Sequence, residues 1–454
     1  MATTFTNYDG SISCSPRAVA YPTTITEIQA VMRDSVRYPS PVRAMGSHHS
    51  LTPCAVSDGT VVNMSRMTRV IAIDPVLQTI TAEAGLQYID ANAALRKQNL
   101  QFILNIEIGN MTLGSAATCH TKDALDGRVF GQVGSYVTRV KWVDPTGELR
   151  EASEDESPDL LRNVRTSYGL CGVVYEVTLR VKPIEAAQFH YLLRPVDELT
   201  ESEVAGIIDR SEGLVCWTLG RTSVFQTKTR IDDPSLLGEL QARGRRALWN
   251  NIGALWARAI AQYLDGPLED LAQDQLVRLS RMLFSTLEMT GGLHIMDPDK
   301  TIDYRHTEKK ARYAFTFWAF PRARWLSALR EYLDFADAHR KRYGFRCNMP
   351  LGSYYVRQDD HALLSYSGKG EIFSLDPIHA PTDQAAWDRF LKEFNEWAAQ
   401  RGGIPLLNQS PFVTRAHCEQ AYRERWTEFG AWVRSVDPGG RMLTPFFRDL
   451  LLPA

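Results

Sequence analysis

The sequence predicts an α+β protein with more than one domain. The chain has 454 residues, a length that fits two large domains or about three of ordinary size. Short strand patterns alternate with amphipathic helix patterns along it, which is typical of sheets with helices packed on them. The 10 Trp, 17 Tyr and 18 Phe residues argue against disorder, because disordered segments contain few aromatic residues.

Up to about residue 183, predicted strands alternate with predicted helices. Residues 22–27 indicate a helix start, with a threonine cap and an acidic residue in the first turn. Apolar positions continue this helix at Ile28, Val31, Met32 and Val36. A second helix is predicted over residues 89–98. The predicted strands, with a hairpin around the turn 144–147, are residues 60–63, 70–73, 79–83, 137–143, 148–151 and 173–181.

The middle of the chain changes character, because two amphipathic helices are predicted there from apolar stripes. The first stripe consists of Leu248, Ile252, Leu255, Trp256, Ala259, Ile260 and Tyr263. The second consists of Leu268, Leu271, Leu276, Leu279, Leu283 and Leu287. Strands at 215–219 and 313–319 and helices at 323–340 and 383–402 surround them, so we expect an α+β domain. From about residue 410 the pattern is mostly helical.

Composition argues against several classes of function. The 51 basic and 53 acidic residues give a net charge of −2, which offers no footprint for nucleic acid or an anionic membrane surface. No apolar run approaches the roughly 18 residues of a membrane span. The start of the chain lacks the basic and apolar stretches of a secretory signal. The seven cysteines are scattered without a CxxC pair, so we expect a reducing, cytoplasmic location.

Common catalytic and nucleotide-binding motifs are absent from the sequence. It contains no GxGxxG, GxxxxGKS/T, HExxH or GxSxG run. A Rossmann dehydrogenase, a P-loop enzyme, a zinc protease and an α/β-hydrolase therefore all lose support. We expect no metal site.

Three segments rich in small residues are the candidate ligand-binding elements. Residues 43–50 place a glycine and serines around two histidines, in a loop whose N–H groups suit a phosphate; an ordinary polar turn is the alternative. The small residues of 110–120 let a planar ligand approach the backbone, or pack tightly as a strand and turn. The glycines of 168–174 allow a close backbone approach or mark a bulge.

In their order and separation, these segments resemble the flavin-binding domain of the vanillyl-alcohol oxidase and p-cresol methylhydroxylase (PCMH) superfamily. The likeness is closest to the alditol oxidase and sugar-1,4-lactone oxidase branch. Residues 46–50 (GSHHS) resemble the family's Gly-Ser-Gly-His-Ser loop, and residues 114–118 (GSAAT) its Gly-Ser-x-Ala-Thr run. Residues 168–174 (YGLCGVV) are similar to its Leu-Gly-Ala-Leu-Gly-Val-Val run, and residues 437–440 to its closing Asp-Pro-x-Gly turn.

The resemblance implies an α+β, two-domain PCMH-type FAD-binding fold with an α+β substrate (cap) domain. Residues 1–183 are expected to form the FAD-binding domain, and 184–409 the cap domain with a helical insertion. Residues 410–454 are expected to be helices that return to the FAD-binding domain. The cofactor-binding residues that it implies are Arg43, Met45, Gly46, Ser47, His48, His49, Ser50, Asn110, Thr112, Gly114, Ser115, Thr118, Cys119, Gly169, Gly172, Val173 and Val174.

The resemblance also implies that the FAD is covalently bound. His49 matches the histidine that this branch joins to the flavin 8α-methyl group. Some relatives add a second bond through a cysteine, but Asn110 occupies that position, so we expect one bond. His48 stands at a family glycine, and we expect a solvated loop side chain there. Cys119 is expected to be a buried small residue rather than a flavin ligand.

The substrate side departs further from the family. Gln409 stands where the family has a lysine beside the flavin, and Asn348 lies in a stretch that lacks the family's Glu-x-Arg pair. Tyr355, on a cap stretch expected to face the flavin, is the third catalytic candidate. Leu406 and Leu407 replace a His-Trp pair, so we expect a more apolar pocket wall.

The implied activity is that of an FAD-dependent oxidoreductase. A CH–OH or CH–NH donor gives a hydride to the flavin while a base takes the neighbouring proton. The expected partners are molecular oxygen as acceptor and a small-molecule substrate that is not a simple polyol.

Three alternatives stay open. The first is a dehydrogenase that uses another acceptor, and the second is a flavin-binding protein without turnover. The third is a partner-binding module over residues 240–290. Its basic and aromatic residues are Arg243, Arg245, Arg246, Arg258, Trp249 and Trp256. We favour packing of this apolar stripe inside the cap domain.

Overall fold

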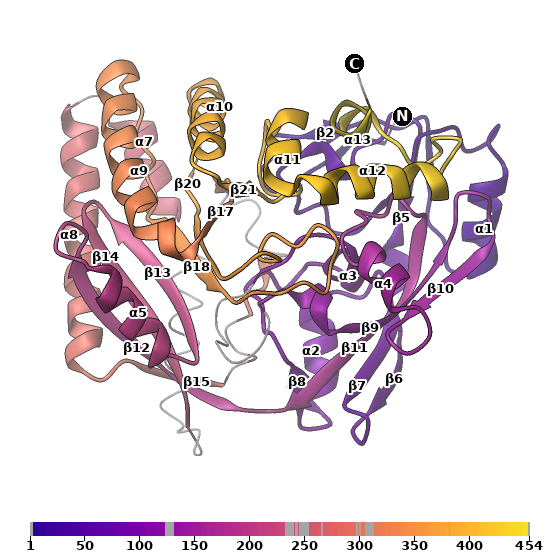
Figure 1. Ribbon diagram of the computed structural model, residues 1–454, viewed down its shortest axis with the longest axis horizontal. Coiled ribbons are helices and arrows are strands. Elements are labelled where there is room, and N and C mark those ends of the chain that lie inside the picture. Colours follow the sequence, from indigo (N-terminus) through magenta and orange to yellow (C-terminus); the bar gives the residue numbers. More distant parts are fainter. Residues whose placement is uncertain are drawn as a thin grey trace.

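The computed structural model describes residues 3–122, 131–231, 240, 244, 254–264, 267–296, 298, 301–304, 313–380 and 382–452. The first part of the chain and its C-terminal helices lie on one side of the molecule, and the middle of the chain lies on the other (Figure 1). The predicted mixture of helices and sheets is confirmed. None of the helices in these ranges combines the length and apolarity needed to cross a membrane.

The first body contains a parallel and an antiparallel sheet. Its strands are β1 (Phe5–Thr6), β2 (Ser13–Cys14), β3 (Ala18–Ala20), β4 (Val42–Met45), β5 (Thr60–Asn63), β6 (Val70–Asp74), β7 (Thr79–Glu83), β8 (Leu100–Phe102), β9 (Val137–Val143), β10 (Leu149–Ser153) and β11 (Val173–Pro183). The parallel sheet has the order β3-β5-β4. The antiparallel sheet has the order β10-β9-β11-β7-β6, and β8 pairs with β11.

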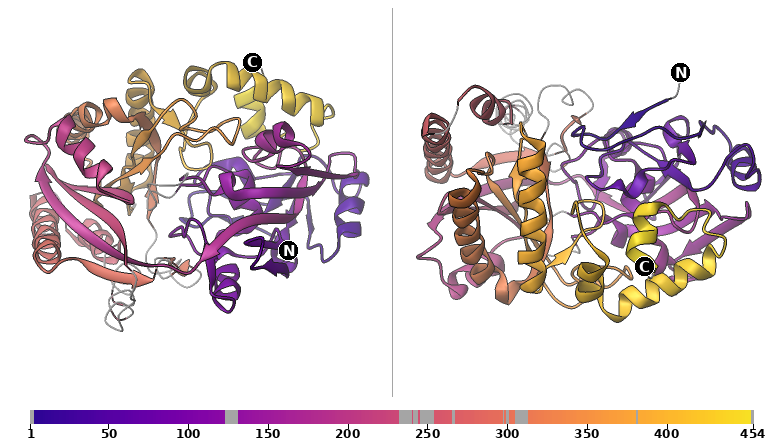
Figure 2. Two further views of the ribbon diagram at one scale, coloured as in Figure 1. Left: turned by 60° about the horizontal axis from the view of Figure 1, so that its bottom comes forward. Right: turned by 90° about the horizontal axis from the view of Figure 1, so that it is seen from above.

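Helices from both ends of the chain cover these sheets. They are α1 (Ile25–Arg33), α2 (Tyr88–Arg96), α3 (Leu113–Thr118), α4 (Pro158–Val164), α11 (Arg415–Tyr422), α12 (Glu424–Val436) and α13 (Pro445–Leu451). The yellow C-terminal helices lie over the indigo and purple part of the chain in every view (Figures 1 and 2). Their apolar side chains, such as Trp426, Phe429 and Phe447, share one buried core with Val42 and Val143.

Most predicted elements of this body are confirmed, because their signals are local. Thr24 caps α1 and accepts a hydrogen bond from the Glu27 N–H in a capping box. Strands β5 and β7 have the predicted bounds, and the hairpin pairs β9 with β10. One prediction at the end of α1 is wrong. The helix ends at Arg33, and Val36 is 94% exposed, because Asp34 terminates the helix before the apolar position is reached.

The second body is a long sheet with helices on both faces. Its strands are β12 (Ala186–Pro195), β13 (Gly213–Leu219), β14 (Thr222–Ile231), β15 (Leu293–Met296), β16 (Ala314–Phe315), β17 (Trp318–Pro321), β18 (Leu351–Val356), β19 (Ile372–Leu375), β20 (Ile378–His379) and β21 (Ile404–Pro405). Its helices are α5 (Glu201–Asp209), α7 (Ala254–Tyr263), α8 (Pro267–Met289), α9 (Arg322–Tyr343) and α10 (Gln384–Gln400).

The sheet of the second body has the order β15-β12-β14-β13-β18-β19-β17-β21. Helices α5, α9 and α10 pack on one face, where Trp325 and Phe394 are buried. Helix α8 packs on the other face through Val277, Phe284 and Leu287. Because side chains alternate along a strand, neighbouring residues of β18 reach opposite faces.

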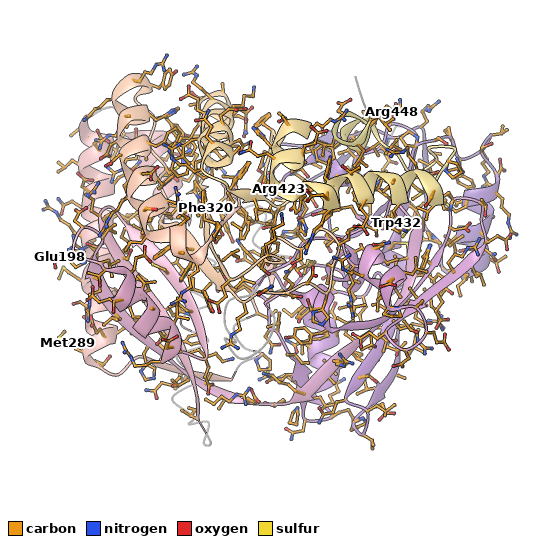
Figure 3. The ribbon with its side chains drawn as sticks, in the orientation of Figure 1. Glu198, Met289, Phe320, Arg423, Trp432 and Arg448 are labelled. Atoms are coloured by element: carbon orange, nitrogen blue, oxygen red, sulfur yellow. The ribbon has the colours of Figure 1, made fainter. Side chains whose placement is uncertain are left out.

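Two predictions in the second body differ from the structure. Residues 313–319 form two strands instead of one: Ala314 pairs with β20, and Trp318 pairs with β19 and β21. The expected burial of the apolar stripes is found only in part, because Leu287 packs on the sheet while other members of the stripes are exposed. Trp256 is 57% exposed and Tyr263 is 76% exposed; Met289, at the end of α8, also lies at the surface (Figure 3). Leu248, Ile252, Arg243, Arg245, Arg246 and Trp249 lie outside the described residues.

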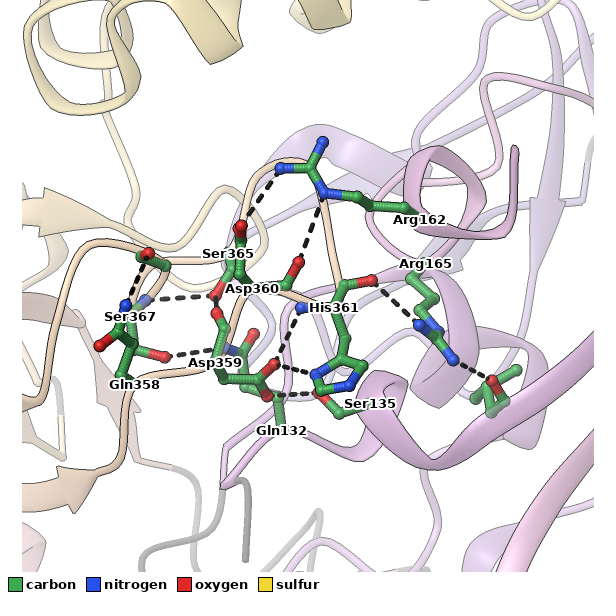
Figure 4. A network of polar contacts seen from close by, with 12 residues as sticks. Gln132, Ser135, Arg162, Arg165, Gln358, Asp359, Asp360, His361, Ser365 and Ser367 are labelled. Carbon is green, nitrogen blue, oxygen red and sulfur yellow. Dashed lines mark hydrogen bonds and ion pairs between the residues drawn. The ribbon is translucent and has the colours of Figure 1, made fainter. Parts of the chain in front are cut away.

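A polar network joins the segment after β18 to the first body (Figure 4). Asp359 accepts hydrogen bonds from Ser135 and from the backbone N–H of His361. Gln132 donates to Ser365 at 2.7 Å, and Arg165 donates to the His361 carbonyl at 3.1 Å. The network is partly buried, so these bonds hold the 357–370 segment against the first body and fix the position of the second body beside it.

A candidate flavin site and an adjoining cavity

The three small-residue segments lie together around one cavity, which we call the first cavity. Its lining comes mainly from residues 43–50, 108–119, 168–174 and 408–409. All the residues predicted to contact a cofactor are in this lining except Asn110 and Val173. The segments are far apart in sequence, and the sheets of the first body bring them to one place.

The loop after β4 forms one wall of the first cavity. At Gly46 a Cβ atom would lie 2.3 Å from Thr112 Oγ1, so this close approach of the two segments requires glycine. The N-terminal segment holds the loop from the other side. The Tyr8 N–H donates to the His48 carbonyl at 3.0 Å, and Asn7 Nδ2 donates to the Ser50 carbonyl at 3.0 Å. The loop is therefore held in place before any ligand binds.

Arg43 carries a buried positive charge at this cavity. The residue is 4% exposed, and its Nη2 atom donates to the Cys54 and Tyr168 carbonyls. Its Nε and Nη1 atoms have no hydrogen-bond partner among the described residues. Burial lowers the pKa of the guanidinium. Unused N–H donors on a buried cation are suited to an anionic ligand such as a pyrophosphate.

His49 lies in the same wall with a shielded, unbonded nitrogen. Its ring stacks on Tyr8 with the centroids 4.6 Å apart. Its Nε2 atom has no hydrogen-bond partner among the described residues. Burial lowers the pKa of His49 to about 4, and the neighbouring Asn110 offsets this effect only in part. The imidazole is therefore neutral near pH 7, with a nitrogen lone pair that can act as a nucleophile or ligand.

The prediction that His48 is a solvated loop side chain is wrong. His48 is 8% exposed, its backbone φ is 54°, and both ring nitrogens lack partners among the described residues. Burial lowers its pKa to about 4. The local pattern of a polar loop suggested exposure, but the N-terminal segment covers the loop and buries the ring.

Cys119 lines the first cavity and is partly buried. Burial raises the pKa of its thiol to about 12, so the thiol is protonated near neutral pH and is a poor nucleophile. The buried, unbonded polar atoms, the close backbone approach at Gly46 and the buried cation Arg43 together fit FAD in the first cavity.

A second cavity adjoins the first. The two cavities share Ile108, Met111 and Gln409 in their linings. The second cavity has a volume of about 90 Å³. It is otherwise lined by Ile106, Glu107, His120, Thr121, Lys122, Trp217, Tyr304, Tyr313, Phe315, Tyr354, Asp376 and Ile378. Most of these side chains are aromatic or aliphatic, so the second cavity suits a small molecule with an apolar body.

Lys122 and Asp376 form a buried ion pair in this lining. The side chains of Lys122 and Asp376 are 11% and 3% exposed. The Lys122 ammonium also lies over the ring of Phe317 at 3.8 Å and the ring of Tyr354 at 4.2 Å. Burial lowers the pKa of Lys122 and raises the pKa of Asp376 to about 6, and the attraction between the two charges offsets both effects.

The three predicted catalytic residues do not lie together. Gln409 lines both cavities. Asn348 lines neither, because its side chain accepts from the Ala380 N–H and donates to the Ala380 carbonyl. Tyr355 is buried against the α9 and α10 face, where its hydroxyl donates to Glu371 at 2.6 Å. We assign no catalytic role to Asn348 or Tyr355.

The expected apolar wall from Leu406 and Leu407 is also not found. Both side chains are fully buried in apolar cores and line neither cavity. The apolar surface comes instead from aromatic residues such as Trp217 and Tyr354. Sequence reasoning missed Lys122 and Asp376. The available signal was a charged residue beside small or apolar neighbours, which is common and weak on its own.

Comparison with known protein families finds a match in the first part of the chain. A family model described as an FAD binding domain matches residues 16–153. The chain carries an FAD-binding domain. The match contains the loop with His49 and the 110–118 segment. The prediction of an FAD-binding flavoprotein is therefore confirmed.

Relatives of known activity extend the likeness along the chain. The L-gulono-1,4-lactone dehydrogenase of Mycobacterium tuberculosis is 23% identical over all of both chains. The L-gulonolactone oxidase of mouse (Mus musculus) is 28% identical over 41% of each chain. By their names, these relatives are oxidoreductases that act on sugar lactones.

Solved structures share the fold over nearly the whole chain. A solvent-stable cholesterol oxidase matches with a TM-score of 0.78 and 17% identity, over 99% of this chain and 98% of the other. The cholesterol oxidase of Brevibacterium sterolicum matches with a TM-score of 0.74 and 15% identity, over 100% and 97%. The fold is that of these cholesterol oxidases.

Proposed function

We propose that this chain is an oxidase that removes a hydride from a CH–OH or CH–NH donor, using FAD joined covalently to His49. The observation that carries the proposal is the meeting of the two cavities at Gln409, Met111 and Ile108. A ligand in the second cavity would lie beside a flavin held in the first. When bound, FAD supplies hydride acceptance and onward electron transfer; the protein supplies position and charge.

Arg43 and the loop 46–50 would hold the pyrophosphate of FAD. The unused Nε–H and Nη1–H donors of Arg43 are buried at the cavity, and they suit phosphate oxygens. The loop adds backbone N–H groups, and Gly46 keeps it close to Thr112. Both features favour a negatively charged dinucleotide over a neutral ligand.

The neutral ring of His49 supports a covalent bond to the flavin 8α-methyl carbon. In such a bond, His49 would hold the flavin through a C–N bond that takes the place of one methyl C–H bond and one imidazole N–H bond. The two electrons and two protons given up would pass to molecular oxygen and give hydrogen peroxide. Cys119 is not expected to form a second bond, since burial keeps its thiol protonated.

The substrate is proposed to be less polar than an alditol or a sugar lactone. Gln409 carries no charge where the family has a lysine, and aromatic and aliphatic residues make up most of the wall of the second cavity. The relatives act on lactones, as their names say, so lactone oxidation is the comparison to test first.

The acceptor is proposed to be molecular oxygen. One relative is an oxidase and another is a dehydrogenase, so a dehydrogenase with an organic acceptor is the second candidate. Stoichiometric hydrogen peroxide during turnover would support the oxidase. Turnover with a quinone or dye, without oxygen uptake, would favour the dehydrogenase.

Acid precipitation of the purified protein tests the cofactor and its attachment. Wild-type protein should give a yellow pellet, and His49→Ala should release its flavin into the supernatant. His48→Ala is the matched control, because it removes the adjacent buried imidazole and should leave the pellet yellow. Flavin released by His48→Ala, or a flavin peptide that contains Cys119, would contradict the attachment. A colourless wild-type protein that takes up no FAD would contradict the function.

A further inference from the structure

We propose that Asp376 is the proton acceptor of the reaction, and that the second cavity takes a neutral alcohol with a flat apolar ring. The Oδ1 atom of Asp376 would accept the hydrogen bond of the substrate hydroxyl, while Lys122 holds the carboxylate in place. This inference rests on the proposed function, because it needs FAD in the first cavity as the hydride acceptor.

The first observation is the unequal use of the two Asp376 oxygens. Oδ2 contacts the Lys122 ammonium, whereas Oδ1 is buried and has no hydrogen-bond partner of ordinary geometry among the described residues. The Ser374 hydroxyl lies near the carboxylate and lowers its pKa. Asp376 is 2% exposed and lines the second cavity. A buried carboxylate oxygen without a partner is unfavourable, so a hydroxyl or N–H donor on a ligand would satisfy it.

The second observation is that the backbone of Asp376 is fixed. Its N–H donates to the Gly352 carbonyl at 2.8 Å, and its carbonyl accepts from the Gly352 N–H at 3.0 Å. These two bonds tie the residue that follows β19 to strand β18. The carboxylate is therefore positioned by the sheet and not by a loose loop, as a proton acceptor requires.

Lys122 is held by aromatic rings as well as by Asp376. The faces of Phe317 and Tyr354 lie 3.8 and 4.2 Å from its ammonium nitrogen, which places a cation over two π-systems. The Oδ1 atom is left at the wall of the second cavity, beside the first cavity, and this position favours a role toward a ligand.

The charges of the lining select against an anionic substrate. Asp376 and Glu107 are carboxylates, and Lys122 is the cation among the described lining residues. His120 is neutral near pH 7, because burial lowers its pKa to about 4. Trp217, Tyr304, Tyr313 and Phe315 supply aromatic surface around these groups. A flat, uncharged ring matches this wall.

The reaction balances with these groups alone and bound FAD. The carbinol C–H bond breaks and its hydride goes to the oxidised flavin. The O–H bond breaks, its proton goes to Asp376 Oδ1, and its electron pair forms the C=O bond of an aldehyde or ketone. Asp376 is neutral afterwards, and the proton must leave before the next turnover.

Binding is measured on dithionite-reduced protein, which cannot oxidise the alcohol. The probes are 4-methylbenzyl alcohol and 4-(hydroxymethyl)benzoate, which share a ring and differ in charge. Xylitol and L-gulono-1,4-lactone represent polyols and lactones. We expect the neutral aromatic alcohol to bind at least 10-fold more tightly than the other three. Equal or tighter binding of the benzoate or of xylitol would overturn the substrate class.

Proton transfer is measured as the anaerobic rate of flavin bleaching by 4-methylbenzyl alcohol. For the wild type, the rate should rise with pH to a plateau, with a midpoint near the pKa of about 6 of Asp376, because only the ionised carboxylate accepts a proton. The charged groups that line the second cavity with it are Lys122 and Glu107.

The variant Asp376→Asn keeps an acceptor oxygen but no base, so its affinity for the alcohol should change less than about 3-fold. Its rate should fall about 100-fold or more, and the pH dependence should disappear. An unchanged rate and pH profile would overturn the role of Asp376.

Matched variants separate this role from structural damage. Glu371→Gln removes a carboxylate next to β19 that bonds Tyr355 and lines neither cavity, and it should bleach at the wild-type rate. Asp376→Asn with Lys122→Met removes both charges, so no unpaired cation remains buried. The double variant should bind the alcohol, and its flavin should still bleach slowly. Bleaching at the wild-type rate would contradict the proposal.

Failure of the proposed function looks different in these experiments. A protein without flavin, or a flavin that no alcohol or lactone bleaches, would contradict both the function and this inference. A flavin that the lactone bleaches equally fast in the wild type and in Asp376→Asn would leave the function intact and overturn only the inference.

Discussion

The two cavities that meet at Gln409 are built in different ways. The first cavity is lined largely by backbone and small side chains from a few continuous segments, such as residues 43–50 and 114–119. The second cavity is lined by large and charged side chains from scattered positions, among them Lys122, Trp217 and Asp376. The first lies within the first body, and the second lies where the two bodies face each other.

This difference shows which kind of site a single sequence can reveal. A dinucleotide is held by close backbone approach, and such contact demands glycine, serine and threonine at consecutive positions. These consecutive small residues form a motif that can be recognised in the sequence. A small apolar substrate is held by side chains that any neighbouring element can supply, so no fixed spacing marks its cavity.

The largest effect on stability is expected where backbone packs on backbone at the first cavity. At Gly172 a Cβ atom would lie 2.1 Å from the Val143 carbonyl oxygen, and φ is +138°. Gly172→Ala should therefore lower the free energy of unfolding by about 3 kcal/mol. Gly169, with φ of +67° and no atom closer than 3.6 Å to an added Cβ, is the matched control. Gly169→Ala should cost about 1 kcal/mol. Urea unfolding followed by tryptophan fluorescence measures both, and equal losses would contradict the steric argument.

Gln409, the polar member of the three residues common to both cavities, should affect the rate of flavin reduction without affecting cofactor attachment. Gln409 Oε1 is buried without a partner among the described residues. Gln409→Leu removes a polar group between the two cavities, so we expect flavin bleaching about 100-fold slower. The pellet of the acid-precipitated variant should stay yellow. Loss of flavin from the pellet would indicate that Gln409 helps to hold the cofactor in the first cavity and has no separate role toward the substrate.

Histidine burial predicts how stability depends on pH. Burial lowers the pKa of His120 to about 4, and its Nε2 contacts the Leu364 carbonyl at 2.7 Å. Because the folded-state pKa lies below the ordinary value of about 6.5, stability is complete above pH 6.5 and is lost as pH falls toward 4. Each such histidine contributes a slope of about 1.4 kcal/mol per pH unit in this range.

Two substitutions test this pH dependence. His120→Gln should flatten the slope of the unfolding free energy between pH 6.5 and 4. Asp376→Asn should make it steeper, because the raised pKa of about 6 of Asp376 means that its protonation in acid favours the folded state. Urea unfolding at pH 7, 6 and 5 measures the slopes. Parallel slopes in all three proteins would contradict the assignment of these buried groups.

The smallest effect on stability is expected from removal of a helix cap, and it should be the same in both bodies. Thr24 and Thr200 each cap a helix in a complete capping box, one on α1 and the other on α5. Thr24→Ala and Thr200→Ala should each cost about 1 kcal/mol of stability. Neither should change flavin content or bleaching rate. A cap variant that alters either property would show that the helix positions a cavity and does not only support its own body.

The sequence by itself determined the local elements and the cofactor motif. The cap of α1, strands β5 and β7 and the hairpin of β9 and β10 follow from residue periodicity and turn residues, which act over short stretches of chain. The loop with His49 was recognisable for the same reason. The FAD-binding domain and the mixed architecture could therefore be predicted.

Only the tertiary structure decided which side chains meet across long distances in sequence. Lys122 and Asp376 are brought together by packing of the two bodies, and Tyr354 joins them while Tyr355 turns to the other face of β18. Packing also buried His48 and placed Asn348 away from the cavities. Burial and long-range pairing depend on where whole elements dock, and local periodicity carries no information about that.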